Sequence, residues 1–290
     1  MKEIVIISGK GGTGKTSVAV ALATVASRTV IADCDVDAAD VHLIMKPVVE
    51  HREDFYSGIK AMIDPNLCIS CGLCRKVCRF HAISKTDAAY KVDPLDCEGC
   101  GYCFHVCPVQ AISLPEQNVG QCYVSQSKLK SSMVHARLGI GADNSGKLVA
   151  KVKKDARELA SRTCMNYVLV DGSPGIGCPV ISSLSGADYV LLVTEPTVSG
   201  LSDLQRVWQL TAQFQMPAGC IINKADLNIQ IRDQIRDYLS QNGIKLIDEL
   251  PYDEDFSQAI TNGQSLVEYA SQKWQQRFTQ IWSELTREIQ

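Results

Sequence analysis

The sequence lacks any apolar run long enough to cross a bilayer, and its first residues lead directly into the short apolar stretch 4–7 without the pattern of a signal peptide. It also lacks an excess of basic residues: the formal net charge is −3, which excludes a general nucleic-acid-binding footprint. We therefore expect a cytoplasmic protein with no stable membrane anchor and no nucleic-acid partner. Hydrophobic residues make up 46% of the 290 residues, which predicts a sizeable core and excludes global disorder.

Cysteine is abundant, with 13 residues in the chain. Thiols stay reduced in the cytoplasm, so clustered cysteines indicate metal ligands rather than disulfides. Eight of them form two copies of one run, and each cysteine of the second run lies 29 residues after its counterpart. The runs are Cys68, Cys71, Cys74 and Cys78, and Cys97, Cys100, Cys103 and Cys107, the second followed by Pro108. The match continues into the flanking residues, which indicates a duplicated unit.

The spacing of these runs resembles that of bacterial ferredoxins that carry two [4Fe–4S] clusters. In that pattern three thiolates of one run hold one cluster, and the fourth cysteine of the run ligates the other. We assign the first cluster to Cys68, Cys71, Cys74 and Cys107, and the second to Cys97, Cys100, Cys103 and Cys78. Two zinc sites are the alternative, but zinc prefers separated C-x-x-C pairs and gives no reason for this run.

The first run departs from the ferredoxin pattern at Arg79, where proline is usual. Proline at that position shapes a turn and does not ligate, so the cluster assignment stands. Arg79 and Lys76 are interpreted either as a solvated charge pair, or as charges that raise the potential of the nearby cluster or form a docking patch.

A glycine-rich loop occupies residues 8–16, between the apolar stretch 4–7 and a helix-forming segment at 17–23. Strand, glycine-rich loop and helix together are the context of a phosphate-binding P-loop. Lys15 is expected to reach the β- and γ-phosphates, and the Thr16 hydroxyl is expected to bind Mg²⁺. The expected nucleotide contacts are Gly11, Gly12, Thr13, Gly14, Lys15, Thr16 and Ser17.

Lys10 is an additional lysine early in this loop, and the residues Gly-Lys-Gly-Gly-Thr-Gly-Lys-Thr resemble the deviant Walker A loop of the MinD/ParA/Mrp (SIMIBI) class of P-loop ATPases. The resemblance implies that Lys10 reaches across a nucleotide-sandwich homodimer to the partner's phosphates. It also implies ATP or ADP with Mg²⁺ as ligands, because Asn223 matches the residue that contacts adenine in this class. The loop that contains Pro251 and Asp253 resembles the second adenine-side segment.

Carboxylates follow two further apolar runs, at the end of a strand where ligands bind in open α/β sheets. Asp35 and Asp37 resemble switch I of the class, where a carboxylate orients the attacking water or holds Mg²⁺ through water. We favour Asp35 for that role, with Asp37 second, and a surface carboxylate is the alternative for Asp37 and Asp40. Asp171 stands in the Walker B arrangement, which places its carboxylate beside Mg²⁺.

These motifs predict an α/β fold with a doubly wound, mostly parallel P-loop NTPase sheet, because six apolar runs alternate with helical patterns. The ATPase domain is expected to be discontinuous, at 1–57 and 117–290, with a small α+β bacterial-type ferredoxin domain inserted at 58–116. The polar residues 51–54 and 115–118 are interpreted as the connections.

The C-terminal segment places its apolar residues on one helical face: Trp274, Phe278, Ile281, Trp282, Leu285 and Ile289. Its balanced charges favour a helix docked on the sheet over a membrane-targeting helix. Cys34, Cys164 and Cys220 adjoin apolar strands and are expected to be buried. Cys178 follows the Walker B aspartate at the spacing of a cluster-ligating cysteine in the nitrogenase iron protein, so a dimer-bridging cluster there is a further hypothesis.

The hypothesis that joins both modules is an ATPase whose nucleotide-driven dimer switch is coupled to electron transfer through two [4Fe–4S] clusters, with an unidentified redox partner. An Mrp-like iron–sulfur cluster carrier or assembly ATPase is one alternative. A spatial-organisation ATPase of the MinD/ParA type is the other.

Overall fold

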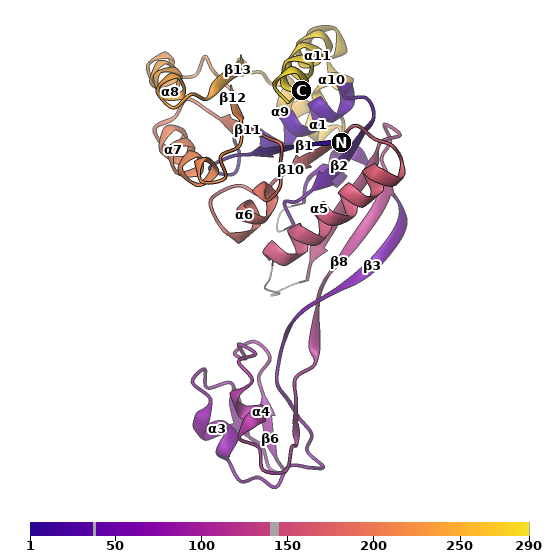
Figure 1. Ribbon diagram of the computed structural model, residues 1–290, viewed down its shortest axis with the longest axis vertical. Coiled ribbons are helices and arrows are strands. Elements are labelled where there is room, and N and C mark those ends of the chain that lie inside the picture. Colours follow the sequence, from indigo (N-terminus) through magenta and orange to yellow (C-terminus); the bar gives the residue numbers. More distant parts are fainter. Residues whose placement is uncertain (37–38, 140–144, 290) are drawn as a thin grey trace. The chain divides into compact units, whose positions relative to one another are not determined.

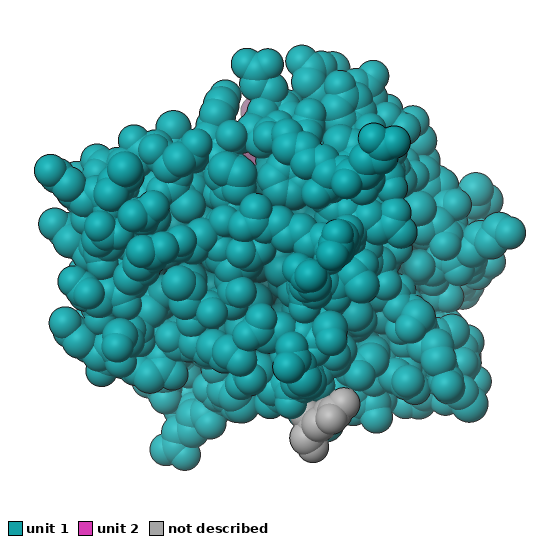
Figure 2. All heavy atoms as spheres, turned by 90° about the horizontal axis from the view of Figure 1, so that it is seen from above, with its two compact units in different colours: residues 1–53, 121–138, 145–290 teal, residues 54–120, 139–144 magenta. Residues whose placement is uncertain are grey.

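The computed structural model describes residues 1–36, 39–139 and 145–289. The chain divides into two compact units (Figure 1). The larger unit contains residues 1–53, 121–138 and 145–290, and the smaller unit contains residues 54–120 and 139–144. Figure 2 shows the heavy atoms of the larger unit in teal.

A nine-stranded sheet has the order β13-β12-β11-β1-β10-β2-β9-β8-β3. Every neighbouring pair from β13 to β9 is parallel, which confirms the expected mostly parallel α/β P-loop fold. The strands are β1 Lys2–Ile7, β2 Thr29–Asp33, β3 Val48–Ile59, β8 Glu116–Gln126, β9 Ser132–Leu138, β10 Tyr167–Asp171, β11 Tyr189–Thr194, β12 Ala218–Ile222 and β13 Lys245–Glu249.

The central strands are buried along their whole length because helices cover both faces of the sheet. One layer packs Ile4 and Ile6 of β1 against α1 and α11, and the other layer includes α5, α6 and α7. The helices of this unit are α1 Lys15–Val25, α2 Val41–Met45, α5 Ser145–Arg162, α6 Cys178–Leu184, α7 Val198–Ala212, α8 Ile229–Gln241, α9 Asp255–Thr261, α10 Leu266–Tyr269 and α11 Ser271–Glu288.

The terminal helix α11 is docked on the larger unit, as its periodicity predicts. Trp274, Phe278, Ile281 and Leu285 are buried in the same core cluster as β1 and α1. In the part of the chain that the structure describes, no helix combines the length and the apolarity needed to cross a membrane.

The smaller unit has a core of its own, which includes Cys74, Ile83, Cys103 and Ile112. Two antiparallel strand pairs frame it: β4 Met62–Ile63 with β7 Ile112–Ser113, and β5 Ile83–Lys85 with β6 Tyr90–Val92. Two short helices, α3 Leu73–Val77 and α4 Tyr102–His105, contact each other.

The sequence repeat is also a repeat of backbone structure. Gly72 precedes α3 with a φ of 78° and Gly101 precedes α4 with a φ of 75°, a left-handed conformation that favours glycine. These glycines are counterparts in the 29-residue repeat. The chain therefore enters the helix of each half through the same left-handed glycine conformation.

The two connections between the units differ from the sequence interpretation. Residues 51–54 lie inside strand β3, and residues 116–118 begin strand β8, so neither segment is an irregular linker. The two strands are neighbours in the large sheet. The chain therefore leaves for the smaller unit and returns from it along adjacent strands.

Candidate functional site

The glycine-rich loop follows β1 and ends in α1, at the edge of the sheet where β10 and β2 also end. The register aligns Ile6 of β1 with Asp171 of β10, and Asp171 with Asp33 of β2. Parallel strands thus deliver the loop and two carboxylates to one place, as expected for an open α/β sheet.

The loop is closely packed at two of its glycines. Gly14 has a φ of 89°, and a Cβ there would lie 2.3 Å from Nδ2 of Asn223. That amide nitrogen donates a hydrogen bond of 2.9 Å to the Thr13 carbonyl oxygen. A Cβ on Gly9 would lie 2.4 Å from the carbonyl oxygen of Asp203 in α7. Asn223 and α7 therefore hold the shape of the loop, and a larger residue at either glycine would displace them.

Four residues that the sequence predicts to bind the nucleotide or Mg²⁺, or to orient the attacking water, lie together in one group, with the ammonium of Lys15 among them. Nζ of Lys15 lies 2.7 Å from Oδ1 of Asp171 and 3.6 Å from Oδ2 of Asp35. The Thr16 hydroxyl donates a hydrogen bond of 2.8 Å to Oδ2 of Asp171. Burial lowers the pKa of Lys15, but the carboxylates of Asp171 and Asp35 raise it more, so the group stays cationic.

Asp33 is a member of this site that the sequence analysis did not single out. Its side chain is buried, and among the described residues its Oδ2 atom has no hydrogen-bond partner. Burial and the neighbouring Asp171 raise the pKa of Asp33 well above its ordinary value. Its place as the last residue of β2, at the carboxyl edge of the sheet, was the signal available in the sequence.

Of the other two switch I candidates, the structure describes Asp40, which does not join this group. Asp40 is exposed and precedes α2 without capping it through its side chain. Asp37 lies outside the described residues. Of the expected carboxylates that the structure describes, Asp35 and Asp171 are the ones at Lys15.

Lys10 is held within its own chain by residues that follow β11. Its Nζ lies 2.8 Å from Oε1 of Glu195, 2.8 Å from Oγ of Ser199 and 3.3 Å from Oγ1 of Thr197. The other oxygen of Glu195 lies 2.7 Å from Nζ of Lys224. We call Lys10, Glu195 and Lys224 the latch. The role of Lys10 across a dimer stays a prediction.

The two segments expected beside adenine lie next to each other. The Ala225 N–H donates to the Leu250 carbonyl oxygen at 2.8 Å, and the Tyr252 N–H donates to Oδ1 of Asp226 at 2.6 Å. Asp226 is thereby engaged by the chain itself. The base contacts expected of Asn223, Pro251 and Asp253 stay predictions: Pro251 and Asp253 are half-buried in the second segment, and Asp253 pairs with Lys273.

In the smaller unit, the four cysteines assigned to the first cluster line one cavity, together with Tyr90 and Ile112: Cys68, Cys71, Cys74 and Cys107. Burial raises the pKa of Cys74, and the charges of the other three thiols raise it further. Cys107 of the second run thus joins three cysteines of the first run, as the assignment requires.

The second set is less completely gathered. Burial raises the pKa of Cys103, and the charges of Cys97 and Cys100 raise it further, so these three thiols are neighbours. Cys78 and Cys97 are half-buried and pack against the core of the unit. Within the described ranges, no three His, Cys, Asp or Glu side chains are placed to hold a single metal ion.

The remaining cysteines correct one expectation. Cys34 and Cys220 are fully buried, but Cys164 is exposed, because it follows α5 in a turn with a φ of 52° instead of continuing into β10. Cys178 is exposed at the first turn of α6.

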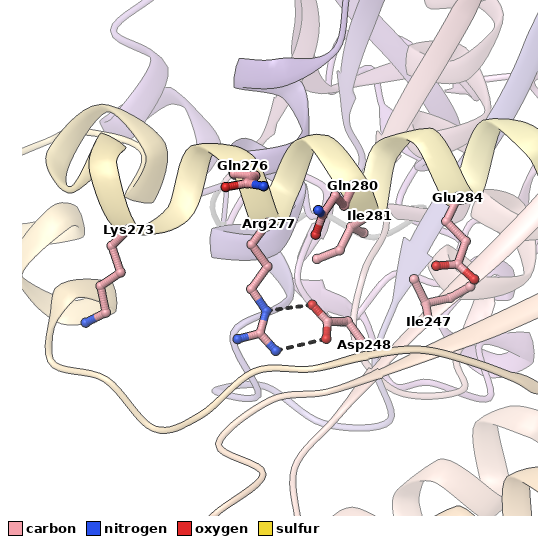
Figure 3. A pocket seen from close by; sticks show the side chains of 8 residues that line it. All are labelled: Ile247, Asp248, Lys273, Gln276, Arg277, Gln280, Ile281 and Glu284. Atoms are coloured by element: carbon pink, nitrogen blue, oxygen red, sulfur yellow. Dashed lines mark hydrogen bonds and ion pairs between the residues drawn. The ribbon is translucent and has the colours of Figure 1, made fainter.

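A hollow of the larger unit lies between α11 and β13 (Figure 3). Its lining includes Lys273, Arg277, Asp248 and Glu284. Arg277 faces Asp248 and bonds both carboxylate oxygens, at 2.7 and 2.9 Å. Glu284 pairs with Lys245 at 2.8 Å. Lys273 pairs with Asp255 at 3.0 Å. Each of these charges thus has a partner, so we assign the hollow no chemistry.

Comparison with known proteins gives two kinds of match. The model of the CobQ/CobB/MinD/ParA nucleotide binding domain matches residues 4–267. An uncharacterized protein of Methanocaldococcus jannaschii is 33% identical over 265 residues, covering 90% of this chain and 88% of its own length.

Two solved structures share the fold. MinD of Pyrococcus furiosus, a cell division ATPase, has a TM-score of 0.58 at 19% identity, covering 99% of this chain and 98% of its own. The septum site-determining protein MinD of Pyrococcus horikoshii OT3, solved in complex with Mg-ADP, has a TM-score of 0.57 at 19% identity, covering 98% and 95%.

Proposed function

Because the chain belongs to the CobQ/CobB/MinD/ParA nucleotide-binding family, we propose that it binds and hydrolyses ATP with Mg²⁺ and couples this cycle to two [4Fe–4S] clusters in the smaller unit. The observation that carries the first part is the group of Lys15, Thr16, Asp35 and Asp171 under the glycine-rich loop. The observation that carries the second part is the cavity lined by four cysteines from both runs.

The residues present at the loop fit a magnesium nucleotide. Lys15 is cationic and already binds carboxylate oxygens, which a phosphate would replace. The hydroxyl of Thr13 is buried without a partner in the described part of the chain, and Asp33 leaves one oxygen unpaired there. Thr16 and Asp171 would hold Mg²⁺, which supplies charge neutralisation on the phosphates when bound.

In hydrolysis, each protein group then has one task. Lys15 and the loop N–H groups orient the phosphates and stabilise the charge that develops on them. Asp35, released from Lys15, orients the attacking water. Lys10 leaves Glu195 and binds the phosphates of the second subunit, so the active form is a homodimer. Glu195 keeps Lys224 as its partner during this exchange.

The residues of the smaller unit fit an iron–sulfur cluster better than zinc. Zinc binds thiolates at about 2.3 Å, so its ligands crowd around one point. The described residues offer no such group for a single ion, although four thiols line one cavity. A cluster binds its cysteines through different irons, so its ligands need not meet at one point, and four thiols around one cavity fit that requirement. When bound, the clusters supply one-electron transfer. Cys68, Cys71, Cys74 and Cys107 would hold the first, and Cys97, Cys100, Cys103 and Cys78 the second.

A cluster carrier or assembly ATPase is the second candidate, and one observation favours it: Cys71 and Cys100 are exposed, so a cluster would be accessible to an acceptor protein. A spatial organiser of the MinD/ParA type draws on the fold shared with the two MinD structures. Faster ATP-dependent transfer of iron and sulfide to an apo-acceptor distinguishes the first alternative, and ATP-dependent binding to lipid vesicles or DNA distinguishes the second.

The experiment that tests the proposal is anaerobic purification followed by metal and sulfide analysis, and then redox titration with EPR detection, with and without Mg·ATP. We expect about eight irons and eight sulfides per chain, saturable ATP binding, and a cluster potential that changes with the nucleotide. The variant Lys15→Ala is the control, since it should keep the iron and lose the response to ATP. Zinc in place of iron, or iron without ATP binding, would refute the proposal.

A further inference from the structure

The two halves of the smaller unit share a backbone but carry opposite charges on their exposed surfaces. In the first half Arg75 and Lys76 of α3, with Arg79 just beyond it, are all exposed. Their counterparts in the 29-residue repeat are Phe104, His105 and Pro108.

The reverse difference is found before each helix. Leu67 and Ile69 are exposed in the first half, with relative accessibilities of 54% and 61%. Their counterparts in the second half are the exposed acidic residues Asp96 and Glu98. The first half therefore presents a basic and apolar surface, and the second half an acidic one.

The basic residues are not needed to build the fold. Helix α4 begins at Gly101 with nearly the same backbone as α3 at Gly72, yet it has none of the three cations. Throughout the described residues, no acidic side chain pairs with Arg75, Lys76 or Arg79. Cations in the last turn of a helix gain a little from its dipole, but His105 ends α4 with at most one charge.

The apolar neighbours of these cations make the surface typical of an interface. Leu73 and Phe80 are exposed at 43% and 45%, beside Arg75, Lys76 and Arg79 in the sequence. Exposed apolar and aromatic groups beside arginine are a composition that protein interfaces favour over ordinary surface. Leu73 also lines the cavity of the first four cysteines. A partner seated here would lie next to that cavity.

We propose that Leu73, Arg75, Lys76, Arg79 and Phe80, here called the basic face, dock a redox protein with an acidic surface, so that electrons exchange through the first cysteine set. This rests on the proposed function, because it identifies the chemistry of the unidentified redox partner. Complementary charge chiefly accelerates the encounter and fixes orientation, and apolar contact then holds the complex. The second half repels the same partner through Asp96 and Glu98.

The test compares two double variants of the anaerobically purified full chain. Lys76→Gln with Arg79→Gln removes two charges from the basic face. Lys85→Gln with Lys91→Gln removes two exposed charges from the β5–β6 pair of the same unit and is the matched control. The first readout is binding of a fluorescent oligoglutamate peptide at low ionic strength. We expect the basic-face variant to bind about threefold to a hundredfold more weakly and the control to stay near the unchanged protein.

The second readout is electron transfer to small acceptors. Dithionite-reduced protein gives one electron to ferricyanide, which becomes ferrocyanide, or to hexaamminecobalt(III), which becomes cobalt(II). In the basic-face variant, electron transfer to the anionic ferricyanide should be about threefold to tenfold slower than in the unchanged protein. Electron transfer to the cationic hexaamminecobalt(III) should be no slower. At high salt, the two proteins should reduce ferricyanide at the same rate. Equal effects of both variants on the peptide and on ferricyanide would overturn the proposal.

Three outcomes decide which part of the argument fails. If the unchanged protein forms an oligomer at low salt and the basic-face variant is monomeric, the basic face binds the acidic half of a second copy and the proposal is wrong. If the chain binds no iron, the proposed function fails. If iron is present and the variants behave alike, only the docking surface fails.

Discussion

Replacing Glu195 by glutamine should release the latch on Lys10 without changing the shape of the side chain. Glu195 is buried, with a relative accessibility of 8%, and holds a lysine on each carboxylate oxygen. Glutamine keeps one acceptor oxygen and loses the charge. Lys10 would then be held mainly by the hydroxyls of Ser199 and Thr197.

The magnitude follows from the exposure of the partners. The side chains of Lys10 and Lys224 are each 29% exposed, so each pair lies between a surface ion pair and a fully buried one. Surface pairs contribute about 0.2–1 kcal/mol, and hydrogen bonds to buried charges about 1.5–3 kcal/mol. We take about 1 kcal/mol for the contact with Lys10. Each of the two Lys10 side chains in a homodimer must break this contact before it reaches the other subunit. Losing both contacts therefore removes about 2 kcal/mol and should tighten ATP-dependent dimerisation about thirtyfold.

The assay is sedimentation equilibrium with a non-hydrolysable ATP analogue, over a range of protein concentrations. Glu288→Gln is the matched control, because it removes the same charge from an ion pair with Lys245, at 2.7 Å, on the terminal helix. An unchanged dimerisation constant in a folded Glu195→Gln protein would refute the latch. Weaker dimerisation would refute it as well, because Glu195 would then act within the dimer.

The same variant should change the pH dependence of stability. Burial raises the pKa of Glu195, but the hydrogen bonds from Lys10 and Lys224 lower it more, so that its pKa lies below the ordinary value of 4.5. The stabilisation is therefore present above the unfolded-state pKa, and it is lost as the pH falls through the lower folded-state pKa. As the pH falls below about 4.5, the difference in free energy of unfolding between the unchanged protein and the variant should shrink, and denaturant titrations at several pH values measure it.

Three further predictions concern single sites. Cys74→Ser should remove about half of the bound iron, whereas Cys164→Ser, at an exposed cysteine outside both runs, should leave the iron content unchanged; metal analysis decides. Gly14→Ala should lower the free energy of unfolding by at least about 1–2 kcal/mol and weaken ATP binding, because the new Cβ would lie 2.3 Å from an amide nitrogen. A denaturant titration measures the loss of stability. Gly177→Ala is the control, because its Cβ would meet nothing closer than 3.6 Å. Burial lowers the pKa of His135 to about 4, so stability should fall with decreasing pH from about 6.5 to about 4, and His135→Gln should flatten that dependence; equal slopes for both proteins would contradict this.

The sequence predicted the parts of the fold that local pattern determines. The strands β1, β2, β10, β11 and β12 are short apolar runs because both of their faces are covered, and the turns after them carry the polar motifs. The glycine-rich loop before α1 was predictable because its motif is specific in residue type and spacing.

The strands that escaped prediction are those at one edge of the sheet. Strand β3 is exposed along nearly its whole length and contains the polar residues 50–54, so it shows neither an apolar run nor alternation. Charged edge strands are common because they prevent unwanted strand pairing. Because these strand segments are polar, the sequence pattern indicated linkers.

Within the candidate sites, motif residues were predictable and their non-local partners were not. The spacing of the cysteines placed Cys107 with the first run, and the structure brings it to that cavity. By contrast, the contacts of Lys10 join residues nearly 190 positions apart, with separations of 187 and 189 for Thr197 and Ser199. No local sequence pattern predicts contacts between residues so far apart in the chain. Asp33 was overlooked because one aspartate in a run of three looks like another until burial distinguishes them.

The adjacency of β3 and β8 has a consequence for how this architecture arose and how it can be rebuilt. Because the outgoing and returning strands are neighbours in the sheet, a tight turn between them would close the chain and preserve the strand order. A cassette spliced in at such a hairpin tip demands no new crossover from its host. The smaller unit is therefore exchangeable in principle, and a protein engineer could remove it or transplant it as one piece.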